Sequence, residues 1–161
     1  MATPRGTEFT LDQQICFALY SASRAMTAAY RVGLAPLGLT YPQYVVLLQL
    51  WEHDTLPMGV LSDRLHLDSA TLSPLLKRLT TMGLVERRRR VADERVVDVH
   101  CTPAGHALRE RARAVQAEVE LATRLTPGEL GQLRDELHRL GQDLRDYAQD
   151  AGQLSPGEKI S

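Results

Sequence analysis

The chain of 161 residues contains only two cysteines, Cys16 and Cys101, and its five histidines are scattered. Two distant thiols do not make the dense disulfide framework of small secreted domains, so we expect both to be free thiols in a reducing compartment. No histidine pairs with a C-x-x-C motif, and no metal-ligand spacing occurs. The sequence therefore predicts neither a metal nor another cofactor.

Other absences narrow the function. No apolar run is long enough to cross a membrane and the N-terminus lacks the hydrophobic core of a signal peptide, which predicts a cytoplasmic protein with no membrane partner. No phosphate loop, nucleophile elbow or dinucleotide fingerprint is present, so we do not expect an enzyme. The formal net charge of −1 argues against a uniformly basic nucleic-acid binder but permits a local basic patch.

Residues 58–101 predict a helix over residues 58–65, a tight turn, a second helix and a β-hairpin, which is the order of a winged helix-turn-helix. Asp68 is placed to cap the second helix. Because Pro74 lies inside that helix, the helix either starts late, with Thr71 as its cap, or bends. Two apolar sets should face the core, Val60, Leu61 and Leu65 in the first helix and Leu72, Leu75, Leu76 and Leu79 in the second.

The opposite face of the second helix has the chemistry of a DNA reader, because hydroxyl and cationic groups can bond base edges and phosphates. After Gly83, strands over residues 84–90 and 95–101 flank a charged tip over residues 91–94. The basic run on the first strand, directly after a helix-turn-helix pattern, favours a DNA-contacting wing. From these two elements we expect DNA contacts by Ser69, Thr71, Ser73, Lys77, Arg78, Arg87 and Arg88.

Amphipathic helices flank this segment. Asp12 is placed to cap a long helix that ends near Leu34, and Thr40 with Gln43 forms a capping box for a helix over residues 41–52. Beyond the wing, we expect one helix from Pro103 and a last helix with a leucine ladder over residues 130–147. The ends of the chain, residues 1–11 and 151–161, should be loose.

The apolar stripes outside the winged-helix core predict a symmetric homodimer. We expect one domain over residues 1–161, mainly α-helical with a small β-wing, in which residues 41–103 bind DNA and residues 12–35 and 104–150 are dimerisation helices. Two reading helices related by a two-fold axis fit half-sites about 34 Å apart. The expected operator is therefore an inverted repeat in double-stranded DNA.

The segment from Arg78 to Arg95, followed by Thr-Pro-Ala-Gly at residues 102–105, resembles the MarR family of winged-helix transcription regulators. In that family an arginine of the wing enters the minor groove and an aspartate holds it, which the resemblance carries to Arg95 and Asp93. Over about residues 12–108, including the run from Cys16 to Arg24 and the run from Leu37 to Tyr44, the chain resembles the organic-hydroperoxide-sensing (OhrR) branch.

That resemblance implies that organic hydroperoxide oxidises Cys16 and that Tyr30 and Tyr41 hydrogen-bond its sulfur. Tyr20 shares a helix face with Cys16 and offers another hydroxyl, and a place near the helix start favours a thiolate. Fourteen residues of helix separate Cys16 from Tyr30 by about 21 Å, so a tyrosine that touches the sulfur must come from the second subunit.

Residues 104–161 contain no resolving cysteine, and Cys101 on the outgoing wing strand should pack in the core. A small cellular thiol is therefore expected to complete the oxidation, with an intersubunit bridge between Cys16 and Cys101 as the alternative.

We interpret the chain as a repressor that releases its operator when Cys16 is oxidised, with an activator as the other sense of regulation that the residues permit. One alternative is a MarR-type repressor released by a small aromatic ligand that lodges between the dimer helices and the winged domain, with Cys16 not a sensor. Another is a thiol peroxidase acting through Cys16. Replacement of Cys16 by serine separates the first two interpretations.

Overall fold

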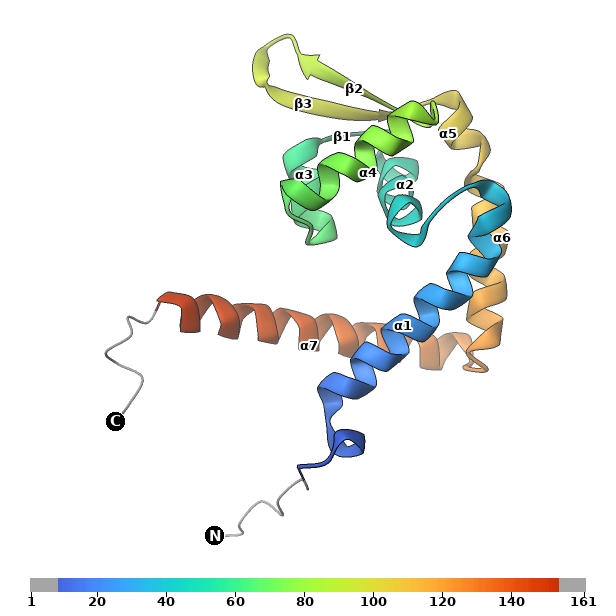
Figure 1. The fold of residues 1–161 in the computed structure, drawn as a ribbon, viewed down its shortest axis with the longest axis vertical. Helices are drawn as coiled ribbons and strands as arrows, with labels where there is room; N and C mark the ends of the chain where they lie inside the picture. Colours follow the sequence, from blue (N-terminus) through green and yellow to red (C-terminus); the bar gives the residue numbers. More distant parts are fainter. Residues whose placement is uncertain (1–8, 154–161) are drawn as a thin grey trace. The chain divides into compact units, whose positions relative to one another are not determined.

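A computed structural model describes residues 9–153. Of the loose ends expected at residues 1–11 and 151–161, residues 1–8 and 154–161 lie outside the described residues. Leu11 lies in a 3-10 turn and residues 151–153 continue the last helix, so the prediction is wrong for these residues. In chain order the elements are η1 (Leu11–Gln13), α1 (Ile15–Leu34), η2 (Ala35–Leu37), α2 (Tyr41–His53), β1 (Thr55–Pro57), α3 (Met58–Leu65), α4 (Ser69–Thr81), β2 (Val85–Arg90), β3 (Asp93–Cys101), α5 (Pro103–Ala107), α6 (Arg109–Ala122) and α7 (Pro127–Gln153), labelled in Figure 1.

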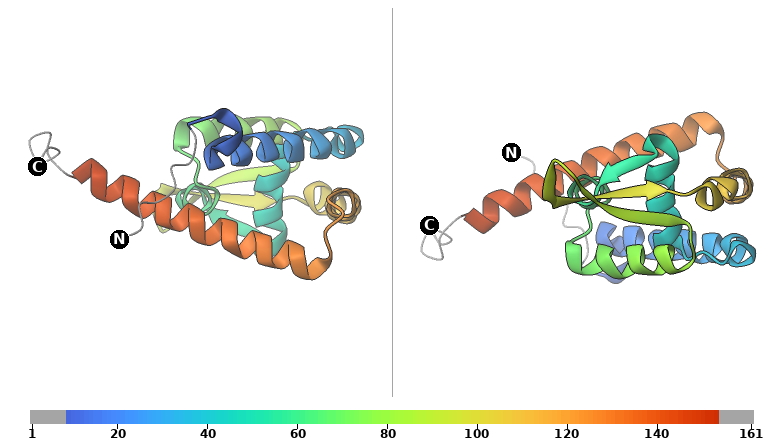
Figure 2. Two further views of the ribbon diagram at one scale, coloured as in Figure 1. Left: turned by 90° about the horizontal axis from the view of Figure 1, so that it is seen from below. Right: turned by 90° about the horizontal axis from the view of Figure 1, so that it is seen from above.

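The chain divides after Val119 into two compact units. In the first unit, α3, α4 and the hairpin of β2 and β3 follow one another as in a winged helix-turn-helix, which confirms the predicted fold class of a mainly helical chain with a small wing (Figure 1). The three strands lie side by side in the order β1-β3-β2, all antiparallel (Figure 2).

The strand β1 was not predicted, because residues 53–57 read as a connection. Its central residue Leu56 is buried and pairs with Val99 of β3. Three residues that end in a proline carry almost no strand periodicity of their own. The strand exists because β3 offers a free edge to pair with, and that edge is formed by residues more than 40 positions later in the chain.

The wing also differs at its tip from the predicted boundaries. The strand β3 begins at Asp93, and the register moves from Arg89 opposite Val97 to Arg90 opposite Asp93. Glu94 to Val96 therefore form a bulge on β3, and the turn itself contains only residues 91 and 92. A bulge increases the local twist and redirects side chains, which the expected four-residue tip would not do.

The helix α1 starts later than predicted. Asp12 does not cap it but lies inside η1, while Gln14 is the N-cap residue and makes no side-chain capping bond. The tight turn is closed by bonds from the Gln13 N–H to the Thr10 carbonyl (3.2 Å) and from the Gln14 N–H to the Leu11 carbonyl (3.1 Å). Cys16 is consequently the second residue of α1, nearer to the helix start than predicted.

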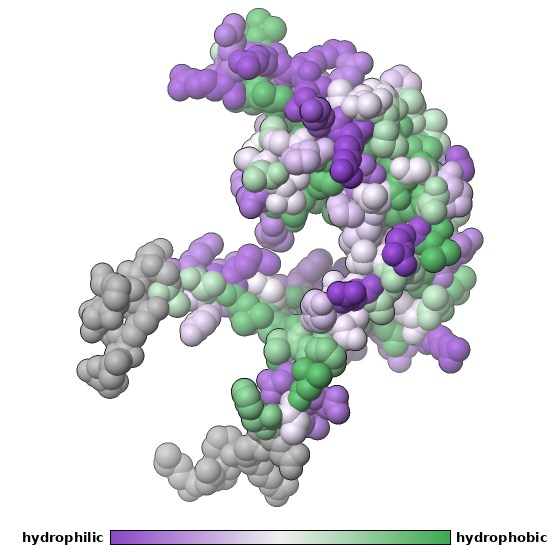
Figure 3. Space-filling view, viewed as in Figure 1, coloured by the Kyte–Doolittle hydropathy of each residue, from purple (hydrophilic) through white to green (hydrophobic). Residues whose placement is uncertain are grey.

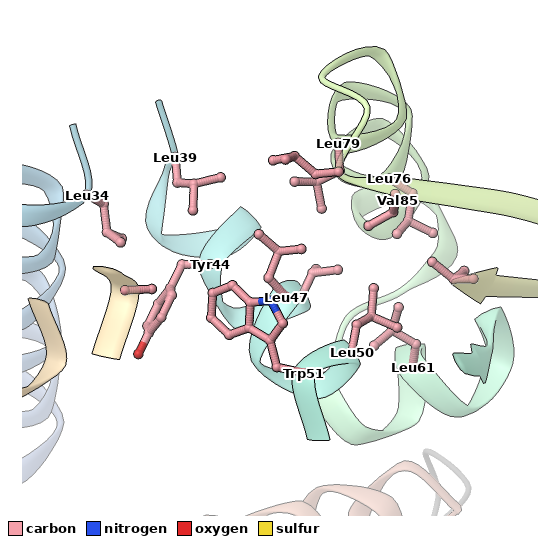
Figure 4. Packing of buried hydrophobic residues seen from close by; sticks show 14 of the residues in the cluster. Leu34, Leu39, Tyr44, Leu47, Leu50, Trp51, Leu61, Leu76, Leu79 and Val85 are labelled. Atoms are coloured by element: carbon pink, nitrogen blue, oxygen red, sulfur yellow. The ribbon is translucent and has the colours of Figure 1, made fainter. Parts of the chain in front are cut away.

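The core of the first unit is built around α2. The capping box is confirmed by the Thr40 N–H, which donates to Gln43 Oε1 at 2.9 Å. Leu47 and Leu50 are fully buried, as Figure 4 shows with their neighbours. Full burial of one such side chain stabilises the fold by about 1.5–3 kcal/mol. The other fully buried leucines are Leu34, Leu61, Leu72, Leu76 and Leu79.

The prediction for α3 is confirmed in its bounds, although Val60 is 41% exposed and does not face the core. In α4, Asp68 is the cap: its Oδ1 accepts from the Thr71 N–H at 2.7 Å, so the late start at Thr71 is wrong. Pro74 lies inside α4 and cannot donate to the Ala70 carbonyl. Because both residues are exposed, water can bond that carbonyl.

The predicted helix from Pro103 is interrupted at Leu108 and forms α5 and α6. The Leu108 N–H bonds to the Gly105 carbonyl, only three residues back, at 3.2 Å. The same carbonyl accepts the indole N–H of Trp51 at 3.0 Å. A tertiary hydrogen bond thus accompanies the tightened turn, and no local pattern in the sequence announces it.

The second unit contains α7, which includes the leucine ladder expected over residues 130–147 and begins at Pro127. The Thr126 N–H donates to Glu129 Oε2 at 2.8 Å, and the Glu129 N–H donates to Thr126 Oγ1 at 3.3 Å, so the two residues cap each other. Along α7 several large apolar side chains are exposed, namely Leu133, Leu137, Leu144 and Tyr147. Within residues 9–153, no helix combines the length and the hydrophobicity that a membrane crossing requires.

Candidate functional site

The exposed face of α4 borders an open groove. Four of the residues predicted to contact DNA, Ser69, Ser73, Lys77 and Arg87, line this groove of about 680 Å³ together with Ala70 and Pro74. Because Arg87 comes from β2 and the others from α4, the structure brings the expected reading helix and the wing to one surface. Thr71 and Arg78 are exposed on α4 but lie outside this groove.

The basic run on β2 has two unlike faces. By the period of two, Arg87 and Arg89 share a face with buried Val85. The other face holds Arg88, whose Nη2 lies 2.5 Å from Glu86 Oε2, and Arg90, which pairs with Asp98. Figure 3 shows the hydrophilic side chains gathered over this hairpin.

The pairing of Arg90 with Asp98 changes both groups electrostatically. The hydrogen bond to Asp98 raises the pKa of Arg90, and the same bond lowers the pKa of Asp98. Among the predicted DNA contacts, Arg88 is included and Arg89 is missing. Arg89 could have been found from the alternation of the strand, because the acids at positions 86 and 98 neutralise only the face that holds Arg88 and Arg90.

At the tip of the wing, Asp93 and Arg95 contact each other. Asp93 Oδ1 accepts the backbone N–H of Arg95 at 3.1 Å and lies 3.6 Å from its side-chain Nε. The Arg95 side chain is 96% exposed and borders a second groove of about 500 Å³ beside Ser69 and the first turns of α3. The aspartate thus restrains an arginine that otherwise extends into solvent.

Cys16 is a free thiol in the first turn of α1, and it is exposed. The apolar stripe that begins beside it is also open: Ile15 is 69% exposed and Met26 is 40% exposed. Since large apolar groups at helical spacing seldom remain in water, this face has the character of a surface that another helix covers.

Tyr30 and Tyr41 are brought together by the fold. Their ring centroids are 5.1 Å apart, and the buried Tyr44 stacks on Tyr30 at 5.3 Å. All three rings lie where the end of α1 meets the start of α2. Because α1 is one continuous helix from Ile15 to Leu34, Cys16 and Tyr30 of the same chain are held about 21 Å apart along it.

Tyr20 is engaged differently. Its hydroxyl accepts a hydrogen bond from Arg24 Nη1 at 2.8 Å, and the Arg24 guanidinium lies 5.5 Å from its ring centroid. The structure therefore joins two of the three predicted tyrosines, Tyr30 and Tyr41, and pairs the third with an arginine one turn along the helix.

Cys101 packs against the core from β3 and is half-buried. Burial raises the pKa of its thiol to about 11, with a further contribution from the nearby Asp54 carboxylate. A thiol held in its neutral form is a poor nucleophile. Cys101 and Cys16 thus differ in exposure, and among residues 9–153 no three His, Cys, Asp or Glu side chains gather as a metal site requires.

A third groove, of about 280 Å³, lies between α2 and α6 within the first unit. Sequence reasoning did not find it, because its two walls are more than 50 residues apart in the chain. Its cations, Arg109 and Arg113, lie one turn apart on α6. The remaining lining residues are Tyr44, Leu48, Trp51, Glu52, Glu110 and Gln116.

Comparison with known proteins gives consistent similarities. The family model described as transcriptional regulator SarA/Rot matches residues 29–111. The organic hydroperoxide resistance transcriptional regulator of Bacillus subtilis (strain 168) is 41% identical over 134 residues, which are 83% of this chain and 91% of that protein. The HTH-type transcriptional regulator TtmR of Methylorubrum extorquens (strain PA1) is 44% identical over 143 residues, 84% of this chain and 73% of the relative.

A solved structure is also similar. In its overoxidised form bound to DNA, AbfR, a protein of Staphylococcus epidermidis, is 34% identical, with a TM-score of 0.69. The match covers 83% of this chain and 94% of the AbfR chain.

Proposed function

This chain belongs to the MarR family of winged-helix transcriptional regulators, and we propose that it is a homodimeric repressor that releases inverted-repeat DNA when an organic hydroperoxide oxidises Cys16. The likeness to the organic hydroperoxide resistance regulator of Bacillus subtilis supports the effector class. The complexes of AbfR with DNA support the partner. The relatives are named as transcriptional regulators, which gives no support to a thiol peroxidase.

One observation carries the redox part of this proposal. The exposed Cys16 lies at the start of α1, whereas the paired rings of Tyr30 and Tyr41 lie at the other end of the same rigid helix. Two copies whose first helices cross antiparallel would bring the thiol of one copy to the tyrosine pair of the other. A sensor assembled in this way changes the fit between subunits whenever the sulfur changes.

The chemical step begins with the Cys16 thiolate. Its sulfur attacks the terminal oxygen of the hydroperoxide ROOH, the O–O bond breaks, and protonation of the leaving alkoxide gives the alcohol ROH and a Cys16 sulfenic acid. The sulfur has lost two electrons and the peroxide has gained them. A small cellular thiol then displaces water from the sulfenic acid and forms a mixed disulfide.

In this proposed function, the winged helix-turn-helix of residues 41–103 binds the operator, and residues 12–35 and 104–150 form the dimer, as parts of one MarR-type domain. Ser69, Ser73 and Lys77 on α4 read the major groove, with Thr71 and Arg78 beside them. On the wing, Arg95 enters the minor groove and Asp93 orients it. Arg87 and Arg89 contact phosphates, while Arg88 is partly neutralised by Glu86.

The experiment that tests the redox function uses a labelled duplex selected by the protein from a random-sequence pool. Wild type and Cys16→Ser are titrated onto the duplex before and after cumene hydroperoxide, with Cys101→Ser as the matched control. We expect wild type and Cys101→Ser to lose affinity and Cys16→Ser to keep it. Release of Cys16→Ser by the peroxide would refute Cys16 as the sensor.

A second candidate is a repressor released by a small aromatic ligand, and the groove between α2 and α6 favours it. Arg109 and Arg113 line the same groove as Tyr44 and Trp51, a combination that suits an aromatic carboxylate. Salicylate is a suitable probe. If salicylate releases the duplex from wild type and from Cys16→Ser alike, and fails with Arg113→Ala, this second function is the correct one.

A further inference from the structure

We propose that Tyr44 and Trp51 are positioning residues. They link Tyr30 and Tyr41, the tyrosine pair of the candidate sensor, to the segment that connects the reading helix α4 with the wing. The inference rests on the proposed function and deepens it, because it names how a change at the sulfur reaches the DNA-binding surface. Neither residue touches the peroxide or the DNA in this proposal. Both act through the residues they hold.

The first part of the connection is a row of aromatic rings. Tyr41 contacts Tyr30 with centroids 5.1 Å apart, Tyr30 stacks on Tyr44 at 5.3 Å and 28°, and Tyr44 contacts Trp51 at 6.2 Å. All these distances lie within the range of about 4.5–7 Å at which aromatic pairs attract. Figure 4 shows the rings of Tyr44 and Trp51 next to each other.

The second part is the indole hydrogen bond. Trp51 is 6% exposed, and its Nε1–H donates to the Gly105 carbonyl at 3.0 Å. An indole has one donor and no acceptor, so loss of this bond would leave a buried N–H without a partner. The bond therefore holds the end of α2 to α5 rather than merely filling space.

Gly105 is in turn fixed to the start of the wing. A Cβ at this position would meet the backbone oxygen of Leu84, so the two backbones are in direct contact. Thr102 Oγ1 accepts the Gly105 N–H at 3.0 Å and donates to the Gly83 carbonyl at 2.7 Å. Because Gly83 and Leu84 join α4 to β2, Gly105 lies against the connection between the two DNA-binding elements.

These contacts make the connection stiff. A packed interior has few voids, and an aromatic ring has only two rotatable side-chain bonds, so a displaced Tyr30 displaces Tyr44 instead of sliding past it. Trp51 then moves with Gly105, because separation costs the indole its hydrogen bond. When the contact between a second copy's sulfur and Tyr30 and Tyr41 changes, the connection between α4 and β2 at Gly83 and Leu84 therefore moves as well.

Trp51 is the only tryptophan of the chain, so its fluorescence reports this position alone. On addition of cumene hydroperoxide we expect the emission of wild type to change in step with the loss of the free Cys16 thiol, and the emission of Cys16→Ser to stay constant. If Cys16 is oxidised completely while the Trp51 emission is unchanged, the inference is overturned.

The decisive measurement is a response ratio, defined as the DNA affinity of a variant when reduced divided by its affinity when oxidised. Trp51→Phe keeps an aromatic ring, although a smaller one, and removes the donor, and we expect the ratio to fall about fivefold to tenfold, the effect of one hydrogen bond. Tyr44→Leu, which removes a ring, should lower it as well. Tyr44→Phe should restore it, and Phe9→Leu, which removes a fully exposed ring outside the DNA-binding and dimerisation ranges, should leave it unchanged.

A residue that only supports the fold would lower the free energy of unfolding, or both DNA affinities, without altering the ratio. Ratios are therefore compared between proteins that have the same free energy of unfolding in urea and the same extent of Cys16 oxidation. Wild-type ratios in both Trp51→Phe and Tyr44→Leu would refute the connection and leave the sensor proposal intact. Failure of wild type itself to lose affinity on oxidation would overturn both proposals.

Discussion

Arg90 and Asp98 form a two-point ion pair across the wing, with Nη2 2.7 Å from Oδ1 and Nε 3.0 Å from Oδ2. This pair, together with Arg88 and Glu86, neutralises one face of β2. The basic run of four arginines is thus divided by the period of the strand. Only the face that turns toward α4 presents arginines without an acidic partner in the pairs above.

The division of the wing predicts unequal roles for its arginines. We expect Arg87→Ala and Arg89→Ala each to reduce the slope of log affinity against log salt by about 0.9, the effect of one lost phosphate contact. Arg88→Ala is the control, because its charge is already compensated by Glu86, and its slope should change least. Fluorescence anisotropy of the selected duplex from low to moderate salt measures the slopes. Equal slopes for Arg88→Ala and Arg87→Ala would contradict this assignment.

The two thiols should differ in reactivity. At pH 8 we expect iodoacetamide to modify the exposed Cys16 while Cys101 reacts slowly, because the raised pKa of about 11 keeps Cys101 neutral. Below that pKa the Cys101 rate should increase about tenfold for each pH unit, as its thiolate fraction does. Mass spectrometry of quenched samples gives both rates. Rapid modification of Cys101 at pH 8 in the native protein would count against its burial at the base of the wing.

Gly105 should not tolerate a side chain. In Gly105→Ala the new Cβ would meet the Leu84 backbone oxygen and would lie 2.8 Å from the Cys101 sulfur, and a backbone atom cannot rotate away. We expect a loss of about 1–3 kcal/mol in the free energy of unfolding, typical of overpacking. Gly59→Ala is the matched control, because nothing lies within 4 Å of its Cβ and it lies in the first turn of α3. Urea denaturation that ranks the two variants equally would disprove this account.

The cap of the reading helix predicts a pH dependence. The side-chain and backbone bonds from Thr71 lower the pKa of Asp68 below its ordinary value of 3.8. A folded-state pKa below the unfolded one stabilises the protein above about pH 4, and this contribution is lost as the pH falls through the folded-state pKa. Asp68→Ala should therefore melt at a lower temperature than wild type at pH 7, with the difference shrinking in acid. An unchanged difference at low pH would indicate that the carboxylate is not the cap.

Much of the DNA-binding part could be predicted because its signals are local. The bounds of α3, the cap Asp68 and the capping box of Thr40 with Gln43 depend on residues only a few positions apart. The predicted helix start at Asp12 was wrong, because a local pattern can fit more than one local structure. An acid before an apolar stripe is compatible with a cap, but bonds to the Thr10 and Leu11 carbonyls form a separate turn there instead.

By itself the sequence determined the order of the main helices and of the two wing strands, the place of Cys16 on the first helix and its separation from Tyr30 along that helix, because helix geometry and hydrophobic periodicity need only neighbouring residues. Tertiary structure alone decided that β1 exists, that Arg90 is paired across the wing, and that Tyr30, Tyr44 and Trp51 form one row of rings leading to Gly105. Each of these depends on packing, an ion pair or a hydrogen bond between residues distant in the chain or from separate elements, and the energy of such contacts exists only once the core has formed.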